Sequence, residues 1–173
     1  RDYSGAQAGA AIERARLRKK AVAKFGEDAG RMYFTRDALE QASDPLVRRY
    51  RTLDVIPGQH IVDACCGIGA DTLAFAQAGS DVIGLDIDPL RVEMARLNAA
   101  ALGVDVQFEV ADVRGGLPNT DLIFFDPGRR DANGKRIFDV ERYQPPLSTI
   151  RGWQAGRIIT KLSPGVDLAQ LQA

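Results

Sequence analysis

Four aspartates stand where short apolar runs of the sequence end, and this placement is the strongest indication of chemistry in the chain. They are Asp63, Asp86, Asp112 and Asp126. If the apolar runs are parallel strands, their carboxyl ends meet at one edge of a sheet, which is where open α/β sheets bind ligands. A row of carboxylates at that edge favours a cationic ligand over a phosphorylated one.

The loop after the first of these runs is suited to close approach of a ligand. Gly67 and Gly69 follow Asp63 closely, and glycine allows a tight turn where a Cβ atom would clash. Thr72 stands where a dinucleotide-binding loop has its third glycine, and Asp71 would repel a pyrophosphate. S-adenosylmethionine has no phosphate, and its amino and sulfonium groups are cationic. The loop therefore fits S-adenosylmethionine better than NAD.

Two further carboxylates fit the adenosyl part of such a ligand. Asp86 follows Gly67 by about 20 residues, a spacing typical of a carboxylate that binds both hydroxyls of a ribose. Ile87 would then lie against one face of the adenine. Asp112 ends the next strand outward and is placed to accept a hydrogen bond from the adenine amino group. Together these residues predict a cofactor site along the sheet edge.

The segment from residue 56 onward alternates short β-rich runs with helical stretches. Strands are expected at 61–64, 81–87, 104–110, 121–125 and 158–162, and helices at 71–78 and 89–102. Pro89 and Gly103 are typical first and terminating residues of a helix. This alternation predicts an α/β fold with a doubly wound parallel sheet and right-handed crossovers.

Residues 1–52 differ in character from the rest. They contain twelve basic and seven acidic residues, and residues 6–25 consist mostly of strong helix formers. Thr35 is a suitable N-cap for a second helix, and a third short one can follow Pro45. The sequence thus divides into a basic helical segment, 1–52, and a domain, 53–173.

The composition excludes several classes of protein. The 173 residues are 45% apolar with no formal net charge, which disfavours a disordered chain and a general polyanion binder. The only cysteines, Cys65 and Cys66, are neighbours, and with the single histidine, His60, they cannot complete a zinc site. No apolar run is long enough to cross a membrane. We therefore expect a cytoplasmic protein without metal.

These motifs in this order resemble the class I S-adenosylmethionine-dependent methyltransferases. The resemblance covers about residues 56–163, through VDACCGIGADTLAFA, VIGLDIDPLRVEMARLNA, ADV and DLIFFDPGRR. The preceding KFGEDAGRMYFTRDALEQAS is similar to the helical lead-in of the trimethylguanosine-synthase-like RNA methyltransferases and their bacterial relatives. The resemblance implies a Rossmann-like fold, S-adenosylmethionine as cofactor, and these cofactor-binding residues: Phe34, Thr35, Asp63, Cys65, Gly67, Gly69, Asp86, Ile87 and Asp112.

The end of the fourth strand resembles the catalytic segment of methyltransferases that act on exocyclic amino groups. That segment reads Asn, Asp or Ser, then Pro-Pro and an aromatic residue. Here Asp126 and Pro127 match and are the candidate catalytic residues, but Gly128 and Arg129 replace the second proline and the aromatic residue. The departure puts amino-group methylation in doubt more than methyl transfer itself.

The loop that follows carries a local surplus of positive charge and is a candidate phosphate clamp. The candidate substrate-binding residues are Arg129, Arg130, Lys135 and Arg136. With the basic N-terminal segment, this loop suggests RNA as the substrate.

Several alternatives remain open from the sequence. The acceptor can be a protein or a small molecule, the chain can be a cofactor-binding module without activity, or, more remotely, it can be an NAD-dependent enzyme. Five strands are expected where methyltransferases of this type have seven. Either the last two strands and a further domain are missing, or a second copy covers the sheet edge.

Overall fold

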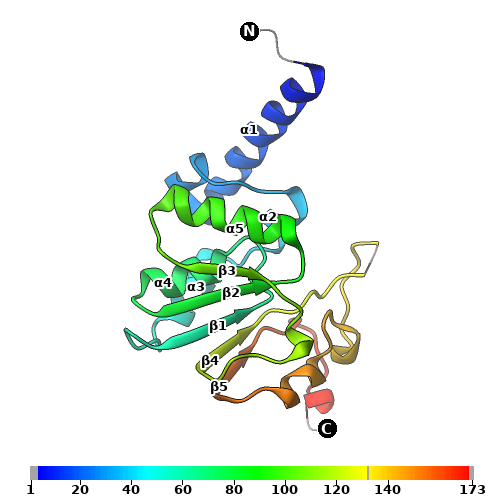
Figure 1. The fold of residues 1–173 in the computed structure, drawn as a ribbon. Helices are drawn as coiled ribbons and strands as arrows, with labels where there is room; N and C mark the ends of the chain where they lie inside the picture. The colour runs from blue at the N-terminus through cyan, green and yellow to red at the C-terminus, as the bar shows by residue number, and fades with distance from the viewer. Residues whose placement is uncertain (1–3, 132, 172–173) are drawn as a thin grey trace.

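The computed structural model describes residues 4–131 and 133–171. Its centre is a five-stranded sheet with the strand order β3-β2-β1-β4-β5, in which every pair of neighbours is parallel (Figure 1). The strands are β1 (His60–Ala64), β2 (Asp81–Asp86), β3 (Gln107–Val110), β4 (Thr120–Phe125) and β5 (Ala155–Thr160). The predicted parallel, Rossmann-like α/β fold is confirmed.

Successive apolar side chains of each strand point to opposite faces of the sheet, and both faces are buried. On β1, Ile61 packs with Phe75 and Phe124 on one face, whereas Val62 packs with Ile123 and Trp153 on the other. The burial of both faces explains why these strands read as nearly continuous apolar runs. Asp63 follows the alternation and points to the same face as Ile61.

One face of the sheet is covered by helices. The helices that lie directly on it are α4 (Ala70–Gln77) and α5 (Pro89–Leu102). Residues of α1 (Gly5–Phe25) and α2 (Arg36–Gln41) share a buried cluster with α5, and α3 (Pro45–Thr52) lies against α4. The opposite face is covered by short 3-10 segments, η2 (Val113–Gly115) and η4 (Leu147–Gly152), together with Trp153. Two further 3-10 turns, η3 (Val140–Arg142) and η5 (Leu168–Leu171), lie near the C-terminal end.

The helix ends follow the predicted signals. Thr35 caps α2 by accepting from the N–H of Ala38, and Asp88 caps α5 immediately before Pro89. Gly103 ends α5 in the left-handed conformation, with φ of 68°. The N–H of Val104 bonds to Ala99 in this cap, which is why β3 begins at Gln107 rather than at the expected residue 104.

The N-terminal segment shares the core of the sheet domain, although the free end of α1 projects away from it (Figure 1). After α1 comes the 3-10 turn η1 (Gly26–Gly30). Leu17, Met32 and Phe34 are buried in the same cluster as Val92 and Phe108. Because the two segments bury apolar surface against each other, their folding is coupled.

A buried asparagine fixes the lead-in to α2 against the domain. Asn98 of α5 accepts from the N–H of Tyr33 at 2.7 Å and donates to the carbonyls of Tyr33 and Ile68. All its bonds go to backbone groups, so the side chain ties residue 33 to the glycine loop of the sheet domain.

No helix of the described residues is long and apolar enough to span a membrane.

Candidate functional site

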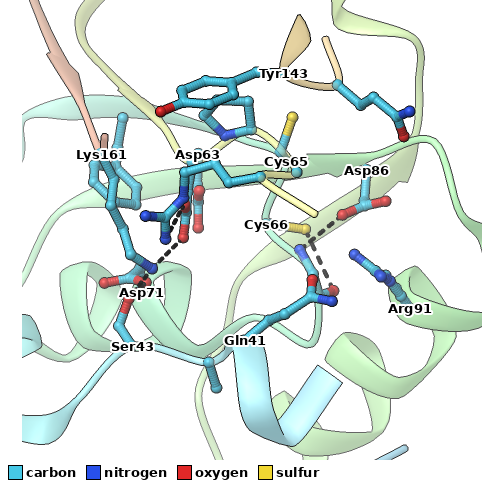
Figure 2. Close-up of a pocket in the computed structure, with 18 of the residues that line it drawn as sticks. Gln41, Ser43, Asp63, Cys65, Cys66, Asp71, Asp86, Arg91, Tyr143 and Lys161 are labelled. Carbon is cyan, nitrogen blue, oxygen red and sulfur yellow. Dashed lines mark hydrogen bonds and ion pairs between the residues drawn. The ribbon is translucent and has the colours of Figure 1, made fainter. Parts of the chain in front are cut away.

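A cavity of about 1000 Å³ lies over the carboxyl ends of the strands, and its walls come from both parts of the chain (Figure 2). The loop after β1 and the ends of β2, β3 and β4 line it, as does the linker between α2 and α3. Figure 2 shows Lys161, Ser43 and Asp71 together on one side of this cavity and Asp86 and Arg91 on the other. The cavity therefore has two chemically distinct ends.

The loop after β1 has the close packing that its glycines predict. Gly69 has φ of 83°, and a Cβ atom there would lie 2.9 Å from the ring of Phe108. Gly84 on β2 has even less room, since a Cβ atom would lie 2.6 Å from the same ring and 3.1 Å from Thr72 Oγ1. Gly84 thus provides the helix–strand contact that the missing third glycine provides in a dinucleotide-binding loop.

Cys65 has a conformation that normally favours glycine. Its φ is 72°, the one positive value among the described residues other than glycine, and its side chain lines the cavity. Burial, reinforced by the charges of Asp86 and Asp63, raises the pKa of the Cys65 thiol, and burial likewise raises the pKa of the Cys66 thiol. Neither thiol is therefore a thiolate nucleophile at neutral pH.

Asp86 is held rigidly at the end of β2. The N–H of Gly67 donates to its Oδ2 at 2.9 Å, and the N–H of Asp88 donates to its Oδ1 at 3.0 Å. The residue is 6% exposed and lines the cavity. Each carboxylate oxygen keeps a lone pair for a ligand, so the pair can accept from two neighbouring hydroxyls.

Asp63 is a buried carboxyl with one oxygen free. Its Oδ2 accepts from the hydroxyl of Thr72, whereas its Oδ1 has no hydrogen-bond partner among the described residues. Burial, and then the charge of Asp71, raise the pKa of Asp63 to about 8. The unsatisfied oxygen leaves an acceptor for a ligand, and a cationic group bound beside it would favour the ionised carboxylate.

Asp112 and Ile87 also line the cavity. The carboxylate of Asp112 accepts hydrogen bonds from both Nε and Nη2 of Arg114, and these bonds lower the pKa of Asp112 to about 2. Ile87 is 62% exposed, which leaves its side chain free for contact with a ligand. The structure thus brings together Asp63, Cys65, Gly67, Asp86, Ile87 and Asp112.

Three of the predicted cofactor residues lie outside the residues that line the cavity. Phe34 is buried in the core beneath it, with its ring 5.3 Å from that of Phe25, and Thr35 caps α2. Gly69 lies behind the loop, at the start of α4. Their contact with a cofactor stays a prediction.

The opposite end of the cavity contains a lysine that the sequence analysis missed. Lys161, directly after β5, donates to Asp126 Oδ2 and, at 3.0 Å, to Ser43 Oγ. Lys161 and Asp126 are 17% and 19% exposed. Burial raises the pKa of Asp126, although the ammonium of Lys161 opposes this shift. The available signal was positional, because Lys161 ends a strand as the four aspartates do.

Ser43 connects this pair to the N-terminal segment. Its hydroxyl donates to Asp71 Oδ2 at 2.7 Å and accepts from Lys161 and from Arg51 Nη1. Arg51 also forms a buried ion pair with Asp71 and lies over the ring of Phe124. A chain of charged and polar groups thus runs from α3 to the end of β4.

The predicted clamp residues lie on a hairpin. Backbone bonds join Arg129 to Ile137 and Asp131 to Lys135, which aligns the two arms. Arg129, Arg130 and Arg136 line the cavity, whereas Lys135 lies outside the lining. Arg129 is partly occupied, because it donates to the carbonyl of Leu162 and its Nη2 lies 3.6 Å from Asp126 Oδ1. Pro127 lines the cavity beside Asp126.

This strand order, the glycine loop and the carboxylates at the sheet edge define a class I methyltransferase fold. Residues 61–126 match the methyltransferase domain family. The chain is 35% identical over 166 residues to an uncharacterized S-adenosylmethionine-dependent methyltransferase of Mycobacterium tuberculosis, covering 92% of this chain and 46% of that protein. It thus spans about half the length of these curated relatives.

Two other comparisons concern a further sequence relative and a solved structure. An uncharacterized RNA methyltransferase of Streptococcus pyogenes is 35% identical over 103 residues, which cover 55% of this chain and 23% of that protein. The crystal structure of a candidate methyltransferase from Porphyromonas gingivalis matches 99% of this chain and 45% of its own, with a TM-score of 0.76 and 23% identity. The second match confirms the fold.

Proposed function

We propose that the chain is an S-adenosylmethionine-dependent methyltransferase domain that acts on RNA. The observation that carries this proposal is the two-ended cavity: one end has carboxylates for a cationic adenosyl cofactor, and the other has a polar pair, Asp126 and Lys161, for an acceptor. The cofactor, when bound, supplies an electrophilic methyl group.

The described residues fit that cofactor by their donor and acceptor chemistry. The unpartnered Oδ1 of Asp63 suits a cationic group, and the fixed carboxylate of Asp86 suits a vicinal diol. The residues at this end orient the cofactor and exclude water from it. Such positioning can supply about 7–11 kcal/mol of the barrier to transfer.

RNA as the acceptor is supported by charge and by one group of relatives. Arg130 and Arg136 on the hairpin line the same cavity as Asp126 and can contact phosphates of an RNA bound there. The streptococcal relative is described as an RNA methyltransferase. The basic N-terminal segment offers less than its charge suggests, because Lys24, Arg48 and Arg51 donate to internal groups.

The test is a pair of measurements on the full-length protein. Calorimetry with S-adenosylmethionine is expected to show binding, and the methyl-labelled cofactor is expected to label total RNA in preference to a protein extract or a metabolite extract. Absence of cofactor binding at millimolar concentration would contradict the methyltransferase proposal. Binding without transfer would favour a module without activity, and transfer to protein or metabolites would replace RNA as the substrate.

The salt dependence of RNA binding tests the hairpin separately. Each phosphate contact contributes a slope of about −0.7 in a plot of log affinity against log salt for a single strand. R130A and R136A are each expected to make that slope less steep by about 0.7, the contribution of one phosphate contact. The matched control is R157A, which removes an exposed arginine of β5 outside both basic clusters and the cavity and is expected to leave the slope unchanged.

A further inference from the structure

The acceptor end of the cavity has more hydrogen-bond donors than an amino-group methyltransferase site would use. An exocyclic amino group offers two donors, and its lone pair is delocalised into the ring, so its binding site must consist of acceptors. Here the carboxylate of Asp126 already receives the ammonium of Lys161. An amino group placed at Asp126 would therefore lie next to the Lys161 ammonium. Both groups are donors, and the amino group has no available lone pair to accept from Lys161.

The hydrogen-bond capacity of Lys161 is not exhausted. Its ammonium has three hydrogens, and two of them go to Asp126 Oδ2 and Ser43 Oγ. Ser43 can take no further bond, because its oxygen donates to Asp71 and accepts from both Arg51 and Lys161. Among residues 4–131 and 133–171 no third acceptor bonds to Lys161, so its third hydrogen remains for a group in the cavity that it lines.

Asp126 also has capacity left, on the oxygen that Lys161 does not occupy. Arg129 Nη2 is 3.6 Å from Oδ1, too far for a hydrogen bond. The site thus offers one cationic donor and one carboxylate acceptor side by side. A hydroxyl complements both, since it accepts from Lys161, donates to Asp126 Oδ1 and keeps a lone pair for attack.

Other oxygen acceptors fit this arrangement less well. A substrate carboxylate or phosphate accepts from Lys161 but has no hydrogen for Asp126, and its charge is repelled by that carboxylate. We propose that the acceptor is a hydroxyl group, in RNA the ribose 2′-hydroxyl, that Lys161 donates to its oxygen, and that Asp126 takes its proton. This inference rests on the proposed function and specifies its acceptor.

The step balances with these groups alone. The hydroxyl oxygen forms a bond to the methyl carbon of the cofactor while the carbon–sulfur bond breaks, and the electron pair of that bond stays on sulfur. The hydroxyl proton passes to Asp126, so the positive sulfonium and the carboxylate become a neutral thioether and a carboxylic acid. Lys161 stabilises the negative charge that develops on the oxygen. Burial of Asp126, which raises its pKa, makes it a better proton acceptor.

The first test identifies the linkage made by the unaltered full-length protein. RNA labelled from the methyl-labelled cofactor is digested, and the nucleosides are fragmented by mass spectrometry. The proposal expects the methyl group to stay with the sugar when the glycosidic bond breaks, and the label to resist alkaline hydrolysis as a dinucleotide. A methyl group on a base nitrogen or carbon would overturn the hydroxyl assignment and leave the proposed methyltransferase function intact.

The second test removes one group at a time. K161M is expected to lower kcat at least about 100-fold, as loss of one donor to a developing oxyanion does, while cofactor affinity changes less than about threefold. K161R, which keeps a cationic donor, is expected to regain part of the activity. The matched control is K20M, which removes an exposed lysine of α1.

D126N separates proton transfer from binding, since an amide can still accept from Lys161. The wild-type kcat is expected to fall at low pH as Asp126 becomes protonated, and D126N is expected to lose at least about 100-fold in rate together with this acid limb. An unchanged pH profile in D126N, or a K161M variant with wild-type kcat, would overturn the proposal. Failure of the wild-type protein to transfer methyl groups to RNA at all would overturn the proposed function and this inference together.

Discussion

The two ends of the cavity stabilise charge in opposite ways. At the cofactor end, Asp86 is fixed by backbone N–H groups and Asp63 has one free oxygen. At the acceptor end, two ion pairs with little exposure join distant segments, Arg51–Asp71 and Lys161–Asp126. The cofactor end is therefore set by local backbone geometry, whereas the acceptor end depends on ion pairs between distant segments.

Breaking the ion pair at the edge of the acceptor end should have the largest effect. R51M leaves Asp71 without its partner although both side chains are nearly buried, at 11% and 10% exposure. The free energy of unfolding is expected to fall by about 3–5 kcal/mol, as measured by urea denaturation. The control R36M breaks an exposed pair with Glu13 and should cost less than about 1 kcal/mol. Equal losses in both variants would contradict the difference between the ends.

At the cofactor end, the corresponding change should affect binding more than stability. D86A removes the carboxylate that holds Gly67 and Asp88 and is expected to weaken S-adenosylmethionine about 100-fold, because bonds to a charged group contribute about 1.5–3 kcal/mol each. Calorimetry measures the change. The control D105A removes an exposed aspartate outside the cavity. Unchanged affinity in D86A would refute the assignment of the ribose site.

The buried carboxyl at the cofactor end predicts a dependence of stability on pH. Because the pKa of Asp63 is raised to about 8 in the folded protein and lies near 3.8 when unfolded, the folded state holds a proton that the unfolded state releases. Its contribution is complete below pH 4 and is lost as the pH rises to 8, at no more than about 1.4 kcal/mol per pH unit.

Urea unfolding at pH 5 and pH 8 measures this loss. D63N has no proton to release and keeps an acceptor for Thr72, so its stability should vary less over that interval. A variant with the same pH dependence as the wild type would assign the effect to another group.

The smallest effect is expected at Cys65. A side chain at φ of 72° is strained, so C65G should raise the free energy of unfolding by about 1 kcal/mol, whereas C65A keeps the strain and should not. Thermal melts of the two variants compare them directly. A C65A variant as stable as C65G would show that the sulfur, and not the backbone, is the source of the strain.

The cofactor end could be predicted from sequence because its signals are local. Gly67 and Asp86, which line the cavity, follow from a strand end and a tight turn, which depend on residues close in the chain. The parallel arrangement of the strands followed from the alternation of strands and helices, whereas their order came from the structure. Some strand boundaries differ from the predicted ones. For example, β5 begins at Ala155 rather than at residue 158, because Ala155 already pairs with Thr120 of β4.

The acceptor end was predicted only in part, because Asp126 and Pro127 follow from a strand-end motif whereas Ser43 and Lys161 do not. The contact between Ser43 and Lys161 joins positions 118 residues apart, and no spacing in the sequence indicates it. The charge of the N-terminal segment also overstated its exposed basic surface, because contacts between distant residues do not appear in a charge count. Lys24 donates to the carbonyls of Leu39, Glu40 and Ala42, so it stabilises the end of α2 rather than facing solvent as a charge count assumes.

The long-range origin of Ser43 and Lys161 has a consequence for how relatives of this chain should be grouped. The span that matches the methyltransferase domain family, 61–126, contains the cofactor-facing aspartates but neither Ser43 nor Lys161. If Lys161 binds the acceptor as proposed, proteins that agree over that span alone can differ in the acceptor group they bind. The proposal then predicts that relatives grouped by the residue after β5, and by the hydroxyl it contacts in the α2–α3 linker, share an acceptor group.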